Sequence, residues 1–321
     1  MSLDFTKAFD NVDHKILMQK ISGSLPRGFL AWISDYLSGR RFKVRVQGAL
    51  SEVYWTQTGV PQGSVLGPPL FSMLVGDLSQ GEIHNTFIQY ADDVNIIIPI
   101  KNRDPQDIGK KVHDQLNAVE NWCRMNKQKL NTEKSKLLLF LRKDLRIDDC
   151  YLQITRVKSL KVLGVVLNEK LKWEDHINAT VKKLSQRLHI LRVLKPYISV
   201  EELHQVYLAM SRSLADYCSP VFVKLPQNLI DKLQRAERRA HRIIYGDACN
   251  CDCDLDGFVK RRISLSKRLF SNIAHSPNHI LTSLMPNILP HNKRYCHFPC
   301  RTNIRLNSFF PFVTLVTNDV E

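Results

Sequence analysis

Two adjacent aspartates are the residues best suited to chemistry in this chain. Strand-forming residues precede and follow Asp92 and Asp93 over residues 88–98, which predicts a hairpin whose turn presents both carboxylates. Ionised neighbours repel each other, so a divalent cation between them is a common reason for such a pair. With Asp4 far upstream, they could hold two Mg²⁺ ions and drive attack of a hydroxyl on a phosphate. The alternative is an ordinary solvated turn, because acidic residues favour turns for local reasons.

A loop rich in glycine and proline separates the two acidic sites. It spans residues 57–71 and runs into an apolar segment. Gly59, Gly63 and Gly67 allow the backbone to approach a ligand closely. Gln62 offers both a hydrogen-bond donor and an acceptor. The loop is therefore a candidate binding element that acts together with the carboxylates.

The order of these blocks resembles the palm domain of reverse transcriptases, specifically those of non-LTR (LINE-type, jockey-like) retrotransposons. The resemblance implies that Asp4, Asp92 and Asp93 are catalytic residues that bind two Mg²⁺ ions. It implies that Phe9 excludes the ribose 2′-hydroxyl of an incoming nucleotide, and that Gln62 lies against template and nucleotide. The residues expected to bind substrate are Phe9, Gln62, Gly63 and Tyr90.

Further blocks extend this resemblance over most of the chain. Residues 121–123 and 130–136 are similar to the family's next motif, in which Lys134 is a candidate proton donor to departing pyrophosphate. Leu163 and Gly164 resemble part of the primer grip. One block would be a weak signal, whereas several blocks in the family's order are specific.

The fold expected from the resemblance is α+β, with a palm built from an antiparallel sheet packed on helices and a mainly helical thumb. We predict a palm over residues 1–170, a thumb over 171–275 and a C-terminal tail over 276–321. The family carries a fingers region ahead of its first catalytic aspartate. The palm is therefore expected to be truncated at its N-terminus, without fingers or endonuclease, and Asp4 is expected to lie on a strand that frays.

The function implied by the resemblance is RNA-directed DNA polymerisation, in which a primer 3′-hydroxyl attacks a deoxynucleotide. The expected partners are an RNA template, a DNA primer and dNTPs, and the family implies an intracellular protein with access to the nucleus. The alternative is a catalytically inactive remnant that binds nucleic acid. The two hypotheses differ in whether Asp4 is held in place for catalysis.

The composition agrees with a nucleic-acid partner. The chain has 321 residues, 44% of them hydrophobic, and a net charge of +15. Such a length can bury a sizeable core, and the charge suits a polyanion, although it also favours solubility or membrane contact. No apolar run reaches about 18 residues, so no membrane span is expected.

A basic stripe is predicted on one helix of the thumb. Within residues 230–245, apolar residues recur on one helical face. Arginines fall on the opposite face, and these candidate nucleic-acid contacts are Arg235, Arg238, Arg239 and Arg242. The stripe could follow a phosphate backbone, or it could be a face that is merely solvated.

The cysteines give a weaker signal. Cys249, Cys251 and Cys253 lack the C-x₂-C spacing of common zinc sites. Cys296 and Cys300, with His297 between them, come closer to a zinc-site spacing. We interpret the cysteines as unpaired intracellular thiols and expect no zinc.

Overall fold

The computed structural model describes most of the chain. The described residues are 1–80, 84–101, 104–140, 153–246, 255–289 and 294–318. They divide into two compact units, Met1–Leu160 and Lys161–Glu321. The division into palm, thumb and tail remains a prediction about function.

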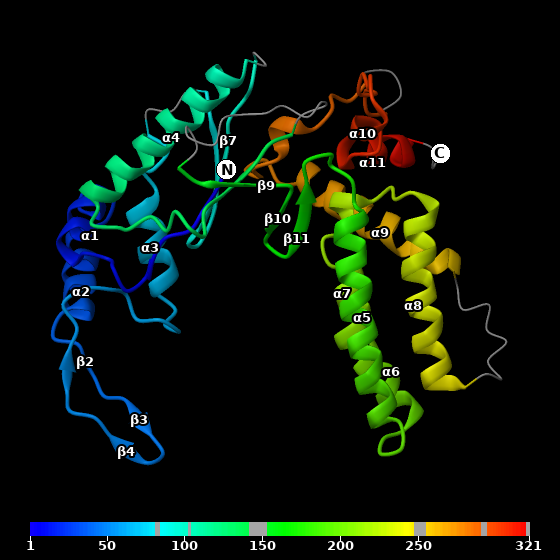
Figure 1. Cartoon of the computed structure of the whole chain (residues 1–321), viewed down its shortest axis with the longest axis horizontal. Coiled ribbons are helices and arrows are strands. Elements are labelled where there is room, and N and C mark those ends of the chain that lie inside the picture. Colours follow the sequence, from blue (N-terminus) through cyan, green and yellow to red (C-terminus); the bar gives the residue numbers. More distant parts are fainter. Residues whose placement is uncertain (81–83, 102–103, 141–152, 247–254, 290–293, 319–321) are drawn as a thin grey trace. The chain divides into compact units, whose positions relative to one another are not determined.

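The first unit is organised around a sheet with the strand order β6-β7-β1-β8-β9 (Figure 1). Its strands are β1 (Ser2–Leu3), β6 (Thr86–Tyr90), β7 (Asp93–Ile97), β8 (Lys136–Leu138) and β9 (Thr155–Val157). The short β1 is antiparallel to both of its neighbours, β7 and β8. The expected antiparallel sheet also contains a parallel pair, β8 with β9, at its edge.

The helices of the first unit are α1 (His14–Ile21), α2 (Arg27–Leu37), α3 (Gly67–Val75) and α4 (Pro105–Met125). Two of these four helices, α1 and α4, begin at an aspartate whose side chain caps the helix. The side chain of Asp13 accepts hydrogen bonds from the backbone of Lys15 and Ile16 at 3.0 and 3.1 Å. Asp104 caps α4 in the same way, and Pro105 occupies its first turn. These caps satisfy donors that a helix leaves without partners.

The hydrophobic core of the first unit joins the sheet to these helices. Leu3 and Val94 from β1 and β7 belong to the same buried cluster as Phe71 of α3 and Leu116 of α4. The apolar residues of the central strands therefore fix where the ends of those strands, with their carboxylates, must lie.

A polar network at the edge of this core involves Trp122, which belongs to the motif block at 121–123. The indole Nε1 of Trp122 donates to Asp77 Oδ1 at 2.8 Å, and Lys20 Nζ lies 2.6 Å from the same oxygen. The Lys20 ammonium also lies 5.0 Å from the centre of the Trp122 ring. The network links α1 and α4 to the segment that follows α3.

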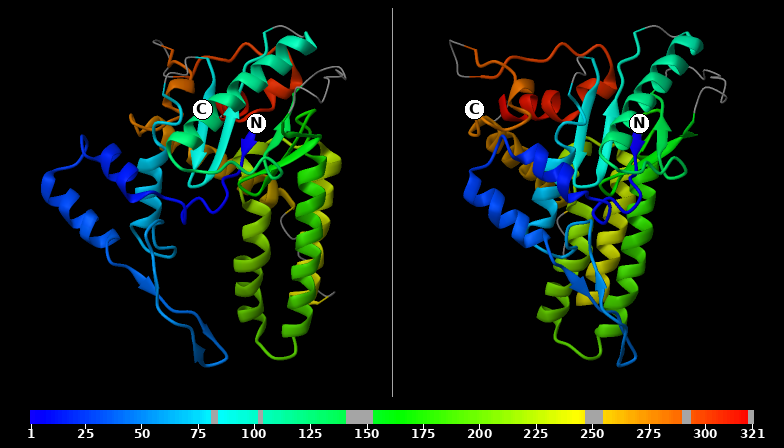
Figure 2. Two further views of the ribbon diagram at one scale, coloured as in Figure 1. Left: turned by 60° about the vertical axis from the view of Figure 1, so that its left-hand side comes forward. Right: turned by 90° about the vertical axis from the view of Figure 1, so that its left-hand side faces the viewer.

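A narrow two-stranded ribbon extends from the end of α2 (Figures 1 and 2). It contains β2 (Arg41–Phe42), β3 (Arg45–Val46), β4 (Ala49–Leu50) and β5 (Tyr54–Trp55). Phe42 faces Tyr54 across the ribbon, and Arg41 faces Trp55.

The second unit is mainly helical. Its elements include the hairpin strands β10 (Ser159–Val162), which begins just before the unit boundary, and β11 (Val165–Asn168). Its longest helices are α5 (Glu174–Leu194), α8 (Gln227–Tyr245) and α9 (Leu255–Ala274). The shorter ones are α6 (Val200–Tyr207), α7 (Ser213–Asp216), α10 (Asn303–Leu306) and α11 (Phe309–Asn318), with a π-helical turn at Leu208–Arg212 and 3₁₀ turns at Ser219–Phe222 and Thr282–Leu284.

Packing of α5 on α8 forms the core of the second unit. Leu184 and Leu233 lie in one buried cluster, and Leu191 and Ala240 lie in a second cluster further along the same helices. The helix α6 begins with a capping box, in which Ser199 and Glu202 exchange side-chain and backbone hydrogen bonds. No helix in the described part of the chain is long and apolar enough to cross a membrane.

Candidate active site

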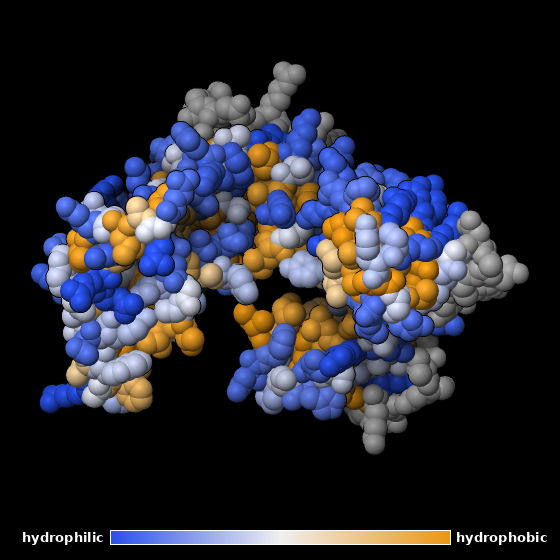
Figure 3. Space-filling model, turned by 90° about the horizontal axis from the view of Figure 1, so that it is seen from below, coloured by the Kyte–Doolittle hydropathy of each residue, from blue (hydrophilic) through white to orange (hydrophobic). Residues whose placement is uncertain are grey.

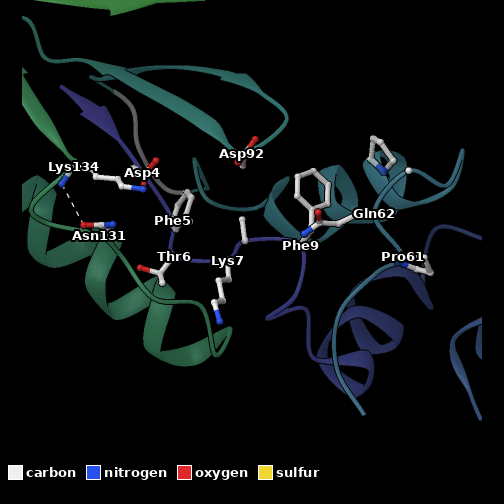
Figure 4. Close-up of a pocket in the computed structure, with 13 residues that line it drawn as sticks. Asp4, Phe5, Thr6, Lys7, Phe9, Pro61, Gln62, Asp92, Asn131 and Lys134 are labelled. Carbon is white, nitrogen blue, oxygen red and sulfur yellow. Dashed lines mark hydrogen bonds between the residues drawn. The ribbon is translucent and has the colours of Figure 1, made fainter. Parts of the chain in front are cut away.

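Residues from separate sequence blocks line one cavity of about 580 Å³ in the first unit (Figure 4). Of the residues predicted from the sequence, those that line it are Asp4, Phe9, Gln62, Gly63, Asp92 and Lys134. Tyr90 and Asp93 are not among its lining residues. Thr6, Lys7 and Asn131 also line the cavity and were not singled out from the sequence.

Asp4 is held firmly at the end of β1. Its backbone N–H donates to Ser135 Oγ at 3.2 Å, and its carbonyl oxygen accepts from the backbone N–H of Asn131 at 2.8 Å. The preceding strand pairs on both sides, with Leu3 opposite Val94 and Ser2 opposite Lys136. The expectation that this strand frays is therefore wrong, because two neighbouring strands and the turn before β8 all bind it.

The predicted hairpin is present, with Asp92 and Asp93 at its turn. Tyr90 pairs with Asp93, so Ala91 and Asp92 form a two-residue connection between β6 and β7. Ala91 has a φ of 53°, a left-handed conformation that costs about 1–2 kcal/mol for a residue other than glycine. The turn thus holds Asp92 over the cavity in a strained backbone.

The charges of Asp4 and Asp92 act on the carboxyl group of Asp93. Partial burial and the negative charges of Asp92 and Asp4 raise the pKa of Asp93 above its ordinary value of 3.8. The carboxylates therefore destabilise one another when all are ionised.

This coupling predicts that Asp93→Asn stabilises the metal-free protein at neutral pH. A raised pKa favours the protonated form, so stability is lost as pH rises through the folded-state pKa, and a neutral amide avoids that loss. In EDTA the thermal midpoint of the variant should exceed that of the wild type at pH 7, and the gain should vanish below the ordinary pKa of 3.8. Asp114→Asn, at an exposed position of α4, should show no such gain. Equal midpoints at both pH values would contradict the coupling.

The donor chemistry of the site fits Mg²⁺. Carboxylate oxygens are the ligands this ion prefers, and it is usually bound by one or two carboxylates, waters and substrate phosphates. Among the described residues, no group of three or more His, Cys, Asp or Glu side chains has the spacing of a complete protein site. In the part of the chain that the structure describes, Asp4 and Asp92 are the carboxylates that line the cavity, which suits an ion that also takes ligands from a substrate.

Lys134 and Asn131 close one side of the cavity. The backbone N–H of Lys134 donates to Asn131 Oδ1 at 3.2 Å, so the asparagine shapes the turn that carries the lysine. Figure 4 shows the Lys134 side chain extending toward Asp4. Asn131 also binds the carbonyl of Asp4, and it therefore ties the lysine and the carboxylate to one turn.

Gln62 is held by a residue that the sequence did not single out. Its side-chain amide donates to Asp10 Oδ1 at 2.9 Å. Gly59, with a φ of 90°, packs so tightly that an added Cβ would lie 2.9 Å from the carbonyl oxygen of Asp10. The glycine at this position allows the loop to lie against Asp10.

Phe9 packs on Phe71 of α3, with ring centres 4.7 Å apart. Phe71 is only 1% exposed, whereas Phe9 is half-buried and borders the cavity. The core thus supports one face of Phe9 from behind.

The predicted primer grip lies in the second unit, in the turn between β10 and β11. Leu163 and Gly164 both have positive φ, at 45° and 88°. The hydroxyl of Tyr217 donates to the carbonyl of Leu163 at 2.7 Å, and its ring would meet a Cβ at Gly164. The turn is therefore held against the segment that follows α7.

The arginine stripe lies on α8 with its side chains at the surface. Leu233, Ala236 and Ala240 are buried on the opposite face, as the periodicity predicted. Exposed on α8 are Arg235, Arg238, Arg239 and Arg242. None of them forms an ion pair with a described carboxylate. Their charge is available to a partner.

If this stripe binds phosphates, replacing its arginines with glutamine should weaken binding to a primer–template duplex for every sequence. Each arginine–phosphate interaction that is removed should make the slope of log K against log salt shallower by about 0.9 on B-form DNA. Glutamine keeps helix propensity nearly intact. A control variant removes the same number of positive charges elsewhere, by replacing with glutamine four exposed residues of the first unit: Lys15, Lys101, Lys110 and Arg124. A slope unchanged by the α8 variant would identify the stripe as a solvated face.

The structure describes only some of the cysteines that the sequence predictions concern. Cys249, Cys251 and Cys253 lie outside the described residues. Cys296 and Cys300 are free thiols of intermediate burial. The absence of zinc remains a prediction.

The chain belongs to the reverse transcriptase (RNA-dependent DNA polymerase) family, whose model matches residues 1–167. It is 26% identical over 254 residues to the probable RNA-directed DNA polymerase from transposon X-element of Drosophila melanogaster, covering 76% of this chain and 28% of that protein. It is 24% identical over 307 residues to the RNA-directed DNA polymerase from mobile element jockey of Drosophila funebris, covering 88% of this chain and 33% of that protein. The chain thus spans about a third or less of the length of these relatives.

A solved structure of telomerase from Candida albicans, in complex with a fragment of telomeric RNA, aligns with 88% of this chain and 48% of that chain. The identity is 11% and the TM-score 0.32, too low to bear on the fold.

Proposed function

We propose that this chain is the catalytic palm and the thumb of an RNA-directed DNA polymerase from a non-LTR, jockey-like retrotransposon. The observation that carries the proposal is the convergence of Asp4, Gln62, Asp92 and Lys134 on one cavity from distant sequence blocks. The substrates would be an RNA template, a DNA primer and dNTPs. Access to the nucleus is part of this proposal and rests on the family.

Asp4, Asp92 and Asp93 would hold two Mg²⁺ ions. When bound, these ions would activate the primer 3′-hydroxyl and neutralise charge on the transferred phosphate. Lys134 lies at the same cavity, where its ammonium would donate a proton to departing pyrophosphate. Phe9, supported by the core, would restrict space at the sugar, and Gln62, held by Asp10, would contact the template and the nucleotide.

The competing hypothesis of an inactive remnant depended on a loosely held Asp4. The hydrogen bonds from Ser135 and Asn131, and the pairing of β1 on both edges, favour catalysis, because phosphoryl transfer depends on accurate positioning.

Primer extension on an RNA template with dNTPs and Mg²⁺ tests the proposal. We expect extension by the full chain and none without Mg²⁺. Binding of primer–template without any extension, at enzyme in excess over primer, would instead support the remnant hypothesis.

A further inference from the structure

The β2–β5 ribbon presents aromatic rings at its surface. Phe42 is 50% exposed, Tyr54 is 55% exposed and Trp55 is 64% exposed. These rings do not belong to the core of the first unit, and none of them lines the candidate active site. At the left of Figure 3, where the first unit lies, hydrophobic residues reach the surface directly beside hydrophilic ones.

The rings are arranged for stacking. Phe42 and Tyr54 lie side by side with centres 5.7 Å apart and an angle of 28° between their planes. Trp55 points to the opposite face of the ribbon, because it pairs across from Arg41 and side chains alternate along a strand. The Arg41 guanidinium lies 5.9 Å from the centre of the Trp55 ring. Both faces of the ribbon therefore offer an aromatic surface.

Basic side chains accompany these rings. From residue 40 to residue 56 the charged residues are Arg40, Arg41, Lys43, Arg45 and Glu52. The basic residues form no ion pair with a described carboxylate. Exposed rings interleaved with unneutralised basic groups are the features by which proteins bind single strands: bases stack on rings, and cations follow the phosphates.

A duplex and a protein partner fit the ribbon less well. Bases inside a duplex are stacked on each other and cannot stack on side chains at its surface. An apolar protein partner would have to desolvate the arginines and lysine without compensation. The excess of positive charge thus favours a polyanion whose bases are free.

We propose that the ribbon of residues 41–55 is a binding surface for single-stranded nucleic acid. It is separate from the polymerase cavity and does not require that cavity to be catalytic. Bases stack on the Phe42–Tyr54 pair on one face of the ribbon and on Trp55 on the other face, while Arg41 and Arg45 contact neighbouring phosphates.

Binding of oligouridine, oligothymidine and an abasic oligomer of equal length tests this surface, with EDTA present so that catalysis plays no part. The triple variant Phe42→Thr, Tyr54→Thr, Trp55→Thr keeps residues suited to strands. We expect it to bind both base-bearing oligomers at least about fivefold more weakly for each ring that stacks, with affinity for the abasic oligomer unchanged. The relative loss for RNA and DNA shows which strand the surface prefers.

A matched pair of single variants controls for the loss of an exposed ring. Trp55→Thr should weaken binding of oligouridine, whereas Tyr197→Thr, at an 80% exposed ring of the second unit, should not. RNA that carries 5-iodouridine should crosslink on irradiation to the peptide containing residues 41–55. Unchanged affinity of the triple variant, or no crosslink to this peptide, would overturn the proposal. Neither result depends on catalysis at the polymerase cavity, because EDTA is present. The substitution Asp92→Asn tests that cavity separately.

Discussion

Asp92→Asn should lower the rate of primer extension by at least about 10³-fold while leaving the fold intact. Asp92 is exposed at a hairpin turn and lines the cavity. In the proposed function the amide would replace an oxygen that holds Mg²⁺, and it would not disturb the core. Loss of a carboxylate ligand removes several kcal/mol of transition-state stabilisation, and about 1.4 kcal/mol corresponds to each tenfold loss in rate. Single-nucleotide incorporation on an RNA template, measured with saturating dNTP, gives this ratio.

Three companion variants separate chemistry from general damage. Asp4→Asn should reproduce the loss, because Asp4 faces the same cavity from β1. Asp114→Asn removes an exposed carboxylate of α4 and should extend primers at the wild-type rate. Lys134→Ala should lower the rate of primer extension by about 10²-fold, which is the lower end of the range for loss of a general acid. It should also alter the dependence of that rate on pH. If Asp92→Asn extended primers at a rate within tenfold of the wild-type rate, catalysis would not depend on Asp92.

Local signals in the sequence could predict the elements that carry the site, whereas the convergence of their residues on one cavity was implied only by the resemblance to reverse transcriptases. Alternating apolar residues around Asp92 predict a hairpin, and the glycines around Gln62 predict a loop that approaches closely. The helices at 14–21 and 105–125 begin after Asp13 and Asp104, whose side chains cap them through contacts that are local in the chain. These features depend on neighbours in the chain and require no knowledge of distant contacts.

The partners of these residues could not be predicted, because they are long-range. Asp10 holds Gln62 across 52 residues, and Asn131 binds the carbonyl of Asp4 from the turn before β8. Nothing local to Asp10 or Asn131 marks them as supports of the site. The expectation that β1 frays is wrong for the same reason. A strand of two residues is not stable by itself, and β1 is held because it pairs with both β7 and β8.

Gly59→Ala should be among the most destabilising single substitutions in the first unit, although it adds only a methyl group. The left-handed φ of 90° costs alanine about 1–2 kcal/mol. The new Cβ would also lie 2.9 Å from the carbonyl oxygen of Asp10, a contact with backbone that cannot be relieved by rotating a side chain. Overpacking of this kind costs about 1–3 kcal/mol. A total of roughly 3 kcal/mol should lower the thermal midpoint by about 6–12 °C.

The difference between Gly59→Ala and Gly63→Ala isolates the steric part of this loss. Gly63 lies in the same loop with a φ of 79°, yet an added Cβ there meets nothing within 4 Å. It should therefore lose only the conformational part, about 1–2 kcal/mol. The backbone N–H of Gly59 donates to Val12 at 2.8 Å and its carbonyl accepts from His14 Nε2 at 2.8 Å, so displacing this glycine also moves the segment that carries Asp10. Gly59→Ala should consequently weaken the hold on Gln62 and raise the KM for dNTP even at temperatures where the variant is folded. Equal midpoints for the two alanine variants would show that the loop yields at Asp10, and that its close approach does not position Gln62.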